Sequence, residues 1–385
     1  MRDEPVSTER IQSAKYRQNP ALFQHGVRKA IQHFSCQNRF DHRLFLQESD
    51  THRVYFHAMS ANLGWGVSCV VLIGLVSLAA HHPQTKTQQE NPALPKVRGQ
   101  CEVCHRQEAQ DWAQSRHAQA WVSETFAMST NNRSIKMCLP CHAPEPILVK
   151  GFGEHPDLRN EMREHGIDCM SCHRDANGGY HGTLGTQPED HPGPVVKNEK
   201  FGTNEMCGTC HEVFGTYDSF KQTQWAKDAH GCVNCHMPVV ERPIAIAPSG
   251  LPARKARVHK FEGATPQMFQ KGVKVEAERK EDVLQVKLES VWVGHTFPTG
   301  PEQVVAIVDV RLMKAGAEVG KKQELLADNV AIDGSDTRLQ PGERRVIRVP
   351  LIGEPDEAVV RILHKRNRDL PDDKAQVLYE TRVKL

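Results

Sequence analysis

The sequence is poor in aromatic residues, because Phe, Trp and Tyr make up only 6% of its 385 residues. A chain of this length is long enough for two or three domains, and so few aromatic side chains are a small supply for cores of that size. The formal net charge is only +2, which gives no indication of nucleic-acid binding. The sequence therefore predicts that something other than aromatic side chains fills part of the interior.

Only one long apolar run is present, residues 63–80, with no charged residue. Its length suits the core of a signal peptide or a minimal membrane-spanning helix, so we expect export to the periplasm or another extracytoplasmic space. Cleavage and retention as an inner-membrane tether are equally compatible with it. We assign residues 59–82 to this signal or anchor, and 1–58 to a leader, a cytoplasmic tail or a start-site artefact.

Cysteine is almost absent outside one repeated pattern. Of 12 cysteines, ten lie in five C-x-x-C-H units, and the other two, Cys36 and Cys69, precede residue 81. Two thiols three positions apart can each add to one haem vinyl group while the next residue turns its imidazole toward the iron. The units therefore predict five covalently bound c-type haems, held by Cys101, Cys104, Cys138, Cys141, Cys169, Cys172, Cys207, Cys210, Cys232 and Cys235, with His105, His142, His173, His211 and His236 as iron ligands.

Two other chemistries use cysteine pairs. Zinc ribbons have no use for a histidine directly after every pair, and a disulfide framework predicts scattered spacings. The five units start 37, 31, 38 and 25 residues apart, so we expect neighbouring haems to lie in close contact. That density favours an electron wire over isolated sites.

The sixth iron position decides between electron relay and catalysis, because a filled position relays electrons and an open one can bind substrate. His117 lies in a segment that predicts a helix over 106–127 and shares one face with Trp121. His181 follows a glycine-containing loop that can carry an imidazole over a nearby iron. We expect both histidines to be distal ligands.

Three further distal ligands are expected. His259 and His295 lie beyond the last motif, on segments with few other reasons for histidine. His165 precedes the third motif and is the fifth candidate. His230, just before the fifth motif, could ligate an adjacent haem or hydrogen-bond a propionate. We expect His155, His191 and His364 on the surface, the last within a strand.

The hydrophobic pattern of the sequence changes near residue 270. Residues 97–265 predict a pentahaem domain of helices and loops, with helices such as 106–127 and 220–230. Residues 271–385 predict short alternating strands. The expected fold is α+β, a mainly helical multihaem domain followed by a C-terminal β-sandwich of the immunoglobulin type, with strands over 273–278, 284–293, 304–312, 344–351, 358–364 and 377–385.

Over residues 97–300 the chain resembles the multihaem c-type cytochrome superfamily that contains hydroxylamine oxidoreductase and its tetrahaem cytochrome partner. Besides the five motifs, the resemblance is carried by Trp112-x-x-Ser115-x-His117-Ala118, Gly166-Ile-Asp-Cys169, Cys235-His236-Met237-Pro238 and His259-x-Phe261-x-Gly263. The Gly294-His295-Thr-Phe-Pro298 segment looks like one found in larger multihaem cytochromes with a β-domain. The resemblance implies distal ligation by His117, His259 and His295.

The sequence departs from that superfamily in two respects. No C-x-x-C-K unit of the kind found in some nitrite reductases is present, and five haems are fewer than the eight of hydroxylamine oxidoreductase. Our first hypothesis is a periplasmic pentahaem cytochrome that passes single electrons between redox partner proteins in respiration, with no catalytic residue assigned. The alternatives are a reductase of nitrogen or sulfur oxyanions with one open haem, and a membrane-anchored electron-transfer subunit of a quinol dehydrogenase.

Overall fold

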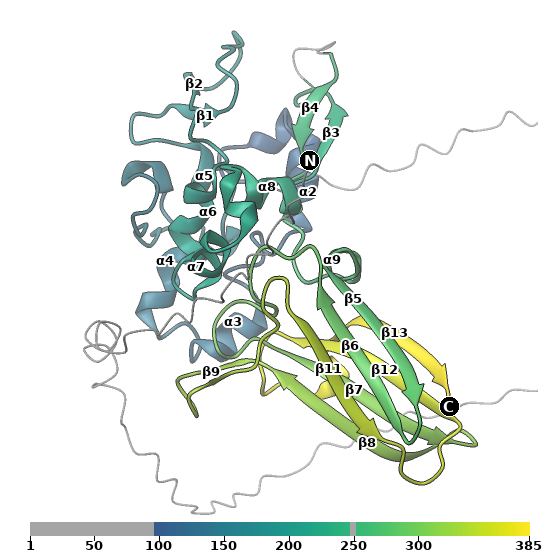
Figure 1. Cartoon of the computed structure of the whole chain (residues 1–385). Coiled ribbons are helices and arrows are strands. Elements are labelled where there is room, and N and C mark those ends of the chain that lie inside the picture. Colours follow the sequence, from purple (N-terminus) through teal and green to yellow (C-terminus); the bar gives the residue numbers. More distant parts are fainter. Residues whose placement is uncertain (1–95, 247–251) are drawn as a thin grey trace, which may run out of the picture. The chain divides into compact units, whose positions relative to one another are not determined.

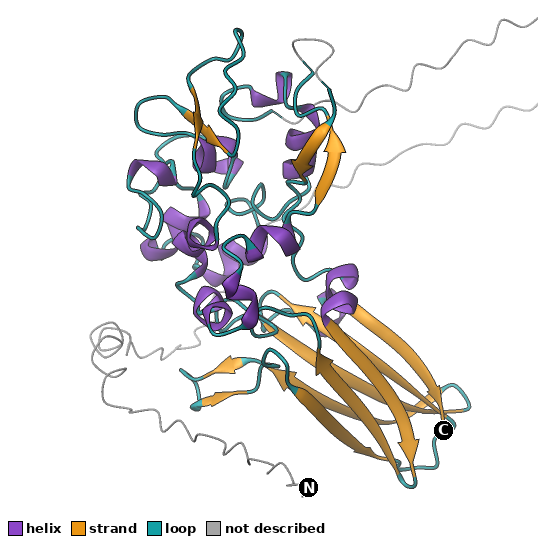
Figure 2. Ribbon diagram, turned by 45° about the horizontal axis from the view of Figure 1, so that its top comes forward, coloured by secondary structure: helices purple, strands orange, loops and turns teal. Residues whose placement is uncertain are grey.

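The computed structural model describes residues 96–246 and 252–385, which belong to one compact unit of the chain (Figure 1). Short helices are frequent up to residue 272, and long strands dominate after it (Figure 2). The expected α+β class is therefore confirmed. The predicted leader and the apolar run, together covering 1–82, lie outside the described residues, as do Cys36 and Cys69.

The helices of the first part are short, and each C-x-x-C-H unit overlaps one of them. Four of these helices, α4, α5, α6 and α8, end on their motif histidine, so each ring leaves the chain where the helix stops. The α-helices are α2 (Arg106–Ala113), α3 (Glu124–Ser129), α4 (Leu139–His142), α5 (Cys169–His173), α6 (Asn204–His211), α7 (Thr216–Lys221), α8 (Gly231–His236) and α9 (Pro266–Gly272). The 3-10 helices are η1 (Cys101–Val103), η2 (Lys136–Cys138), η3 (Ile147–Val149), η4 (Arg163–His165), η5 (Gln224–Lys227) and η6 (Asp372–Lys374).

The helix predicted over 106–127 is broken into α2 and α3. Between them the backbone carbonyl of His117 accepts a hydrogen bond from the N–H of Ile167, which lies far along the chain. This tertiary bond replaces the local bond to residue i+4 that a continuous helix needs. The prediction that His117 shares a helix face with Trp121 is therefore wrong. The helix expected over 220–230 is likewise reduced to the end of α7 and to η5.

The third motif is held by a buried carboxylate. Asp168 caps α5 by accepting a hydrogen bond from the Ser171 backbone N–H at 2.9 Å, and the Ser171 hydroxyl accepts one from the Asp168 N–H. Arg98 pairs with the same carboxylate at 2.7 Å, and Arg159 lies 3.5 Å from it. The side chain of Asp168 is inaccessible to solvent, so these partners are what allow its charge inside.

Hydrophobic packing in the first part is limited. Its cluster of buried residues consists of Val97, Ala109 and Trp112, with a few partly buried neighbours. Other buried apolar side chains of this part, such as Phe126, Ile147 and Phe220, lie outside that cluster. Such scattered packing agrees with the expectation that another apolar body completes this interior.

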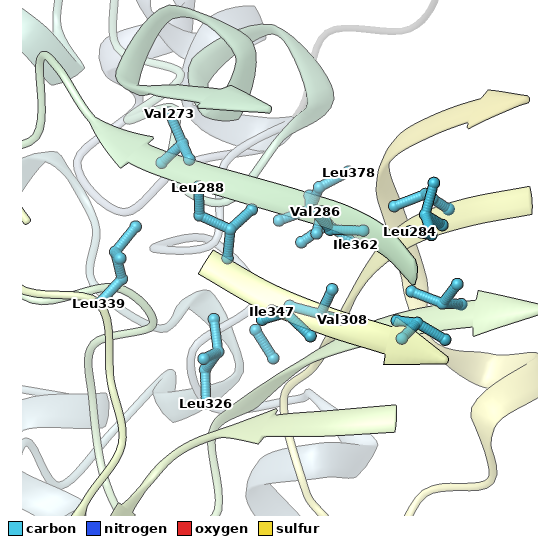
Figure 3. Packing of buried hydrophobic residues seen from close by; sticks show 14 of the residues in the cluster. Val273, Leu284, Val286, Leu288, Val308, Leu326, Leu339, Ile347, Ile362 and Leu378 are labelled. Atoms are coloured by element: carbon cyan, nitrogen blue, oxygen red, sulfur yellow. The ribbon is translucent and has the colours of Figure 1, made fainter. Parts of the chain in front are cut away.

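The second part holds two antiparallel sheets, with strand orders β11-β6-β5 and β13-β12-β7-β8. Strand β6 alternates strictly between buried and less buried residues, the pattern of a sheet with one face inward. Buried side chains of both sheets form one cluster (Figure 3). The strands are β5 (Val273–Lys280), β6 (Val283–Ser290), β7 (Val305–Lys314), β8 (Ala317–Leu326), β11 (Arg344–Pro350), β12 (Glu357–Lys365) and β13 (Gln376–Lys384).

The six predicted strands of this part are all present within a few residues of their expected bounds. Strand β8 was not predicted, because its charged sequence, with Lys321, Lys322 and Glu324, lacks an apolar face, and it lies at the edge of its sheet. Three small pairs complete the fold: β1 (Tyr180–Gly182) with β2 (Val195–Lys197), β3 (Val239–Arg242) with β4 (Arg254–Arg257), and β9 (Asp328–Asn329) with β10 (Ser335–Asp336).

Within residues 96–246 and 252–385, no helix is long and apolar enough to cross a membrane.

Candidate haem-binding sites

All ten motif cysteines are free thiols in the structure, and each is partly exposed. Each pair is three positions apart on one turn of helix, so both sulfur atoms lie on one side of it. In the part of the chain that is described, no group of three or more His, Cys, Asp or Glu side chains is arranged to hold a metal ion. The zinc alternative therefore has no ligand set among these residues.

Motif histidines are oriented by backbone carbonyls. The Nδ1 atom of His105 donates to the carbonyl of Ile244 at 2.6 Å, that of His142 to Ala120 at 2.8 Å and that of His173 to His181 at 2.7 Å. The ring of His236 donates to the carbonyl of Glu262. A carbonyl acceptor fixes the proton on Nδ1 and leaves Nε2 as a bare lone pair, which is the arrangement of metal-ligating histidines.

Three pairs of histidine rings face one another. The ring centroids of His236 and His295 are 6.1 Å apart, and the ring planes differ by 12°. The other two pairs have centroids 6.3 Å apart: His173 with His259, tilted by 34°, and His117 with His211, tilted by 42°. In each pair one member belongs to a C-x-x-C-H motif.

That separation suits a metal ion between two imidazoles. A metal–imidazole bond is about 2 Å long, so two bonds in line plus the inner halves of both rings give a centroid separation of about 6 Å. The residues present therefore fit a haem iron at the third, fourth and fifth motifs.

The facing histidines outside the motifs are kept neutral by burial. Burial lowers the pKa of His117 to about 3, and that of His259 and of His295 to about 4. Their ordinary value is 6.5, so all three rings are unprotonated at neutral pH. A neutral imidazole is the form that binds a metal.

One short segment reaches three of these sites. The ring of His259 faces His173 of the third motif, and the ring of Phe261 lies 4.3 Å from that of His117, which faces the fourth motif. The carbonyl of Glu262 accepts the hydrogen bond from His236 of the fifth motif. Residues 259–262 thus set the positions of ligands at three consecutive motifs.

Cysteines of different motifs adjoin one another. A hydrogen bond with the Cys101 thiol, and then burial, raise the pKa of Cys169. A hydrogen bond with Cys210 lowers the pKa of Cys141 to about 6, and contact with His155 adds to the lowering. Cys207 likewise contacts Cys232. Thiols of the first and third motifs thus lie near each other, as do those of the fourth motif with the second and the fifth.

The two other predicted distal ligands are not opposite a motif histidine in the described structure. The Nε2 atom of His181 lies 2.9 Å from the Asp175 carboxylate, and its Nδ1 lies 3.2 Å from the Asn198 amide. Both ring nitrogens thus have partners, and it is the carbonyl of His181 that supports the third motif. The ring of His165 lies 6.5 Å from that of Trp112 and has a buried Nδ1 without a partner.

His364, expected on the surface, is buried with 8% of its area exposed. Its Nδ1 has no hydrogen-bond partner, its ring lies 6.5 Å from that of Phe297, and burial lowers its pKa to about 4. The signal that could have found it is the strand period, because Val360 and Ile362 on the same face of β12 are core residues.

Comparisons with known proteins agree with the chemistry of these sites. Residues 100–174 match the family described as "Cytochrome c554 and c-prime", and no curated protein matches the chain. A penta-haem cytochrome c552 from Thermochromatium tepidum is similar in structure, with a TM-score of 0.52 and 17% identity, over 75% of this chain and 99% of that chain. The chicken interferon gamma receptor alpha chain covers 38% of this chain and 64% of its own at 14% identity, and its TM-score of 0.20 carries no weight.

Taken with the five motifs, the family match and the first of these likenesses support a class, the multihaem c-type cytochromes. Such a protein carries covalently attached haem and transfers electrons between redox partner proteins. The likeness at 17% identity bears on the fold alone.

Proposed function

We propose that this chain is an extracytoplasmic pentahaem cytochrome that relays single electrons between two redox proteins. The observation that carries the proposal is the set of three facing histidine pairs at the third, fourth and fifth motifs. A histidine on each side of the iron fills both axial positions and leaves none for a substrate. Those three sites are therefore suited to electron relay.

The residues of this chain attach the haems and orient the histidine rings that would bind the irons. The motif cysteines hold each haem by thioether bonds, and the carbonyls of Ile244, Ala120, His181 and Glu262 hold four motif rings in one tautomer. Haem, when bound, supplies the one-electron oxidation and reduction. The contacts between cysteines link the first motif with the third, and the fourth motif with the second and the fifth, which supports close packing of haems within each of these two groups.

The second part of the chain contributes to the fifth site. His295 lies between β6 and β7, and the loop around it contacts α7, where the Thr216 and Thr299 hydroxyls are 2.7 Å apart. The two antiparallel sheets with a common core support the β-sandwich of immunoglobulin type that we propose here. We propose that it holds His295 in place and offers a docking face to a redox partner.

The first test is haem stoichiometry by pyridine haemochrome assay together with electron paramagnetic resonance (EPR) of the oxidised protein. We expect five covalent haems per chain and low-spin signals from the three facing pairs. A protein with fewer than five haems, or with high-spin iron at these three sites, would contradict the proposal. Carbon monoxide and nitrite, added to the reduced protein, should leave these three haems unchanged.

A second candidate, a reductase of nitrogen or sulfur oxyanions, is favoured by the first two motifs. Among the described residues, no histidine ring faces His105 or His142. An iron without a sixth ligand binds small molecules. The same EPR experiment decides, since a high-spin haem that binds nitrite or carbon monoxide would identify an enzyme.

The tethered electron-transfer subunit of a quinol dehydrogenase depends on residues 63–80, which the structure does not describe. Membrane fractionation of the full chain tests it. Release of the haem protein without detergent would exclude a tether, and retention until detergent is added would support one.

A further inference from the structure

The three facing pairs differ in the hydrogen bonds of their outer ring nitrogens. At the third motif both rings have one, because His173 donates to the His181 carbonyl and His259 to the Arg257 carbonyl at 2.9 Å. At the fifth motif both rings also have one, because His236 donates to Glu262 and His295 to Thr296 at 3.0 Å.

The pair at the fourth motif is different. Within residues 96–246 and 252–385, neither His117 nor His211 makes a ring hydrogen bond, although their rings face each other at 6.3 Å. His211 is also the motif histidine that lacks the carbonyl acceptor found for the other four. The motif histidine and the facing histidine that lack a ring hydrogen bond thus belong to the same site.

At His117 an aromatic contact is found where the other two pairs have a hydrogen bond. The ring of Phe261 lies 4.3 Å from that of His117 at an angle of 51°. Aromatic contact holds a histidine ring in place, but it does not accept the ring proton.

This difference bears on the reduction potential of the bound haem. A hydrogen bond from the outer N–H makes an imidazole a stronger electron donor, which stabilises the oxidised iron and lowers the potential. Without that bond the imidazole is a weaker donor and the reduced iron is relatively favoured.

We propose that the His117–His211 pair gives the haem of the fourth motif the highest reduction potential of the three bis-histidine sites, so that electrons collect there. The inference rests on the proposed function. The fourth motif also adjoins a neighbouring one, since its helix α6 contacts α8 of the fifth motif. An electron entering at the fifth haem would therefore reach the fourth in one transfer.

The experiment is a potentiometric titration of the intact haem-loaded protein, followed by EPR. The signal of the fourth haem is assigned as the low-spin component lost in His117→Ala. His259→Ala and His295→Ala assign the other two components, so that the fourth is also known by elimination. We expect this component to disappear first of the three as the potential is lowered.

A matched pair of variants tests the cause. Phe261→Gln places an amide oxygen where it can accept the His117 proton, whereas Phe261→Leu keeps the contact apolar. We expect Phe261→Gln to lower the reduced-to-oxidised ratio of this haem about tenfold at a given potential, which is about 59 mV for one electron. Phe261→Leu should leave the ratio within about a factor of two of the wild type.

Reduction of the fourth component after either of the others would overturn the inference. Equal potentials in Phe261→Gln and Phe261→Leu would overturn its hydrogen-bond basis. Failure of the proposed function looks different, because it would show as missing haems or as high-spin iron at these three sites before any titration.

Discussion

His236 and His295 lie with their ring centroids 6.1 Å apart and their planes within 12° of parallel, although 59 positions separate them in the sequence. One belongs to the last C-x-x-C-H motif and the other to the loop between β6 and β7. The pair therefore connects the helical part with the sheets, at the site that we propose for the fifth haem.

Replacing His295 tests this connection. In His295→Ala one axial ligand is lost, so we expect one haem to change from low spin to high spin and to bind carbon monoxide when reduced. EPR and optical spectra measure both effects. His191→Ala is the control, because His191 contacts Tyr180 and Gly193 and no motif residue. Retention of every low-spin signal in His295→Ala would exclude the ligand role.

The buried carboxylate of Asp168 predicts acid sensitivity. Burial alone would raise its pKa, but the hydrogen bond and charge of Arg98, and the charge of Arg159, outweigh that effect and hold the pKa below its ordinary 3.8. A group with a lowered folded pKa stabilises the fold above its unfolded pKa and loses this contribution as the pH falls through the folded value. Asp168→Asn should therefore cost about 3 kcal/mol at pH 7 and progressively less below pH 3.8.

Urea unfolding at several pH values measures that difference. The control is Asp157→Asn, since the Asp157 side chain is 69% exposed in its pair with Lys150 and exposed pairs contribute little. A constant difference between wild type and Asp168→Asn down to acid pH would contradict the assignment.

Leu288 on β6 is 1% exposed and lies in the core between the two sheets. We therefore expect its replacement to lower the free energy of unfolding strongly. Leu288→Ala removes buried methyl groups and leaves a cavity, so we expect a loss of about 2 to 5 kcal/mol in the free energy of unfolding. Val346→Ala on the neighbouring β11 is the control, because Val346 is 50% exposed, and it should change the free energy by less than about 1 kcal/mol. Similar denaturant midpoints for the two variants would contradict the assignment of one common core to both sheets.

We expect protonation of His364 to destabilise the folded protein in mild acid. Its folded pKa of about 4 lies below the ordinary 6.5, so protonation favours the unfolded chain, and stability falls as the pH drops from 6.5 toward 4. The loss from this residue is about 3 kcal/mol. His364→Phe removes the titration and the unpartnered Nδ1, so the variant should be at least as stable at pH 7 and lose less stability by pH 4.5.

The haem spectra of His364→Phe provide a second measurement. No motif histidine faces His364 in the described structure, so the low-spin signals should be unchanged. Appearance of a high-spin haem would make His364 an axial ligand and would contradict the structural assignment.

Covalent haem attachment could be predicted from short stretches of the sequence. A C-x-x-C-H unit contains both thiols and the proximal imidazole within five positions, so no long-range information is needed to recognise it. The alternating strands after residue 271 were predictable for a similar reason, since strand period is a local property. Strand β8 could not be predicted in this way, because an edge strand with charged residues on its faces has no apolar period to detect.

Tertiary structure decides which histidines lie opposite the motif histidines. His117, His259 and His295 come opposite motif histidines only because distant segments pack together, and the same packing turns His181 toward Asp175 and Asn198. It also breaks the helix predicted over 106–127, through a backbone bond from Ile167 to His117. By itself the sequence predicted which residues attach haem, because attachment is local. Only the fold separated His117, His259 and His295, which lie opposite motif histidines, from His181 and His165, which do not, because that depends on contacts between residues far apart in the chain.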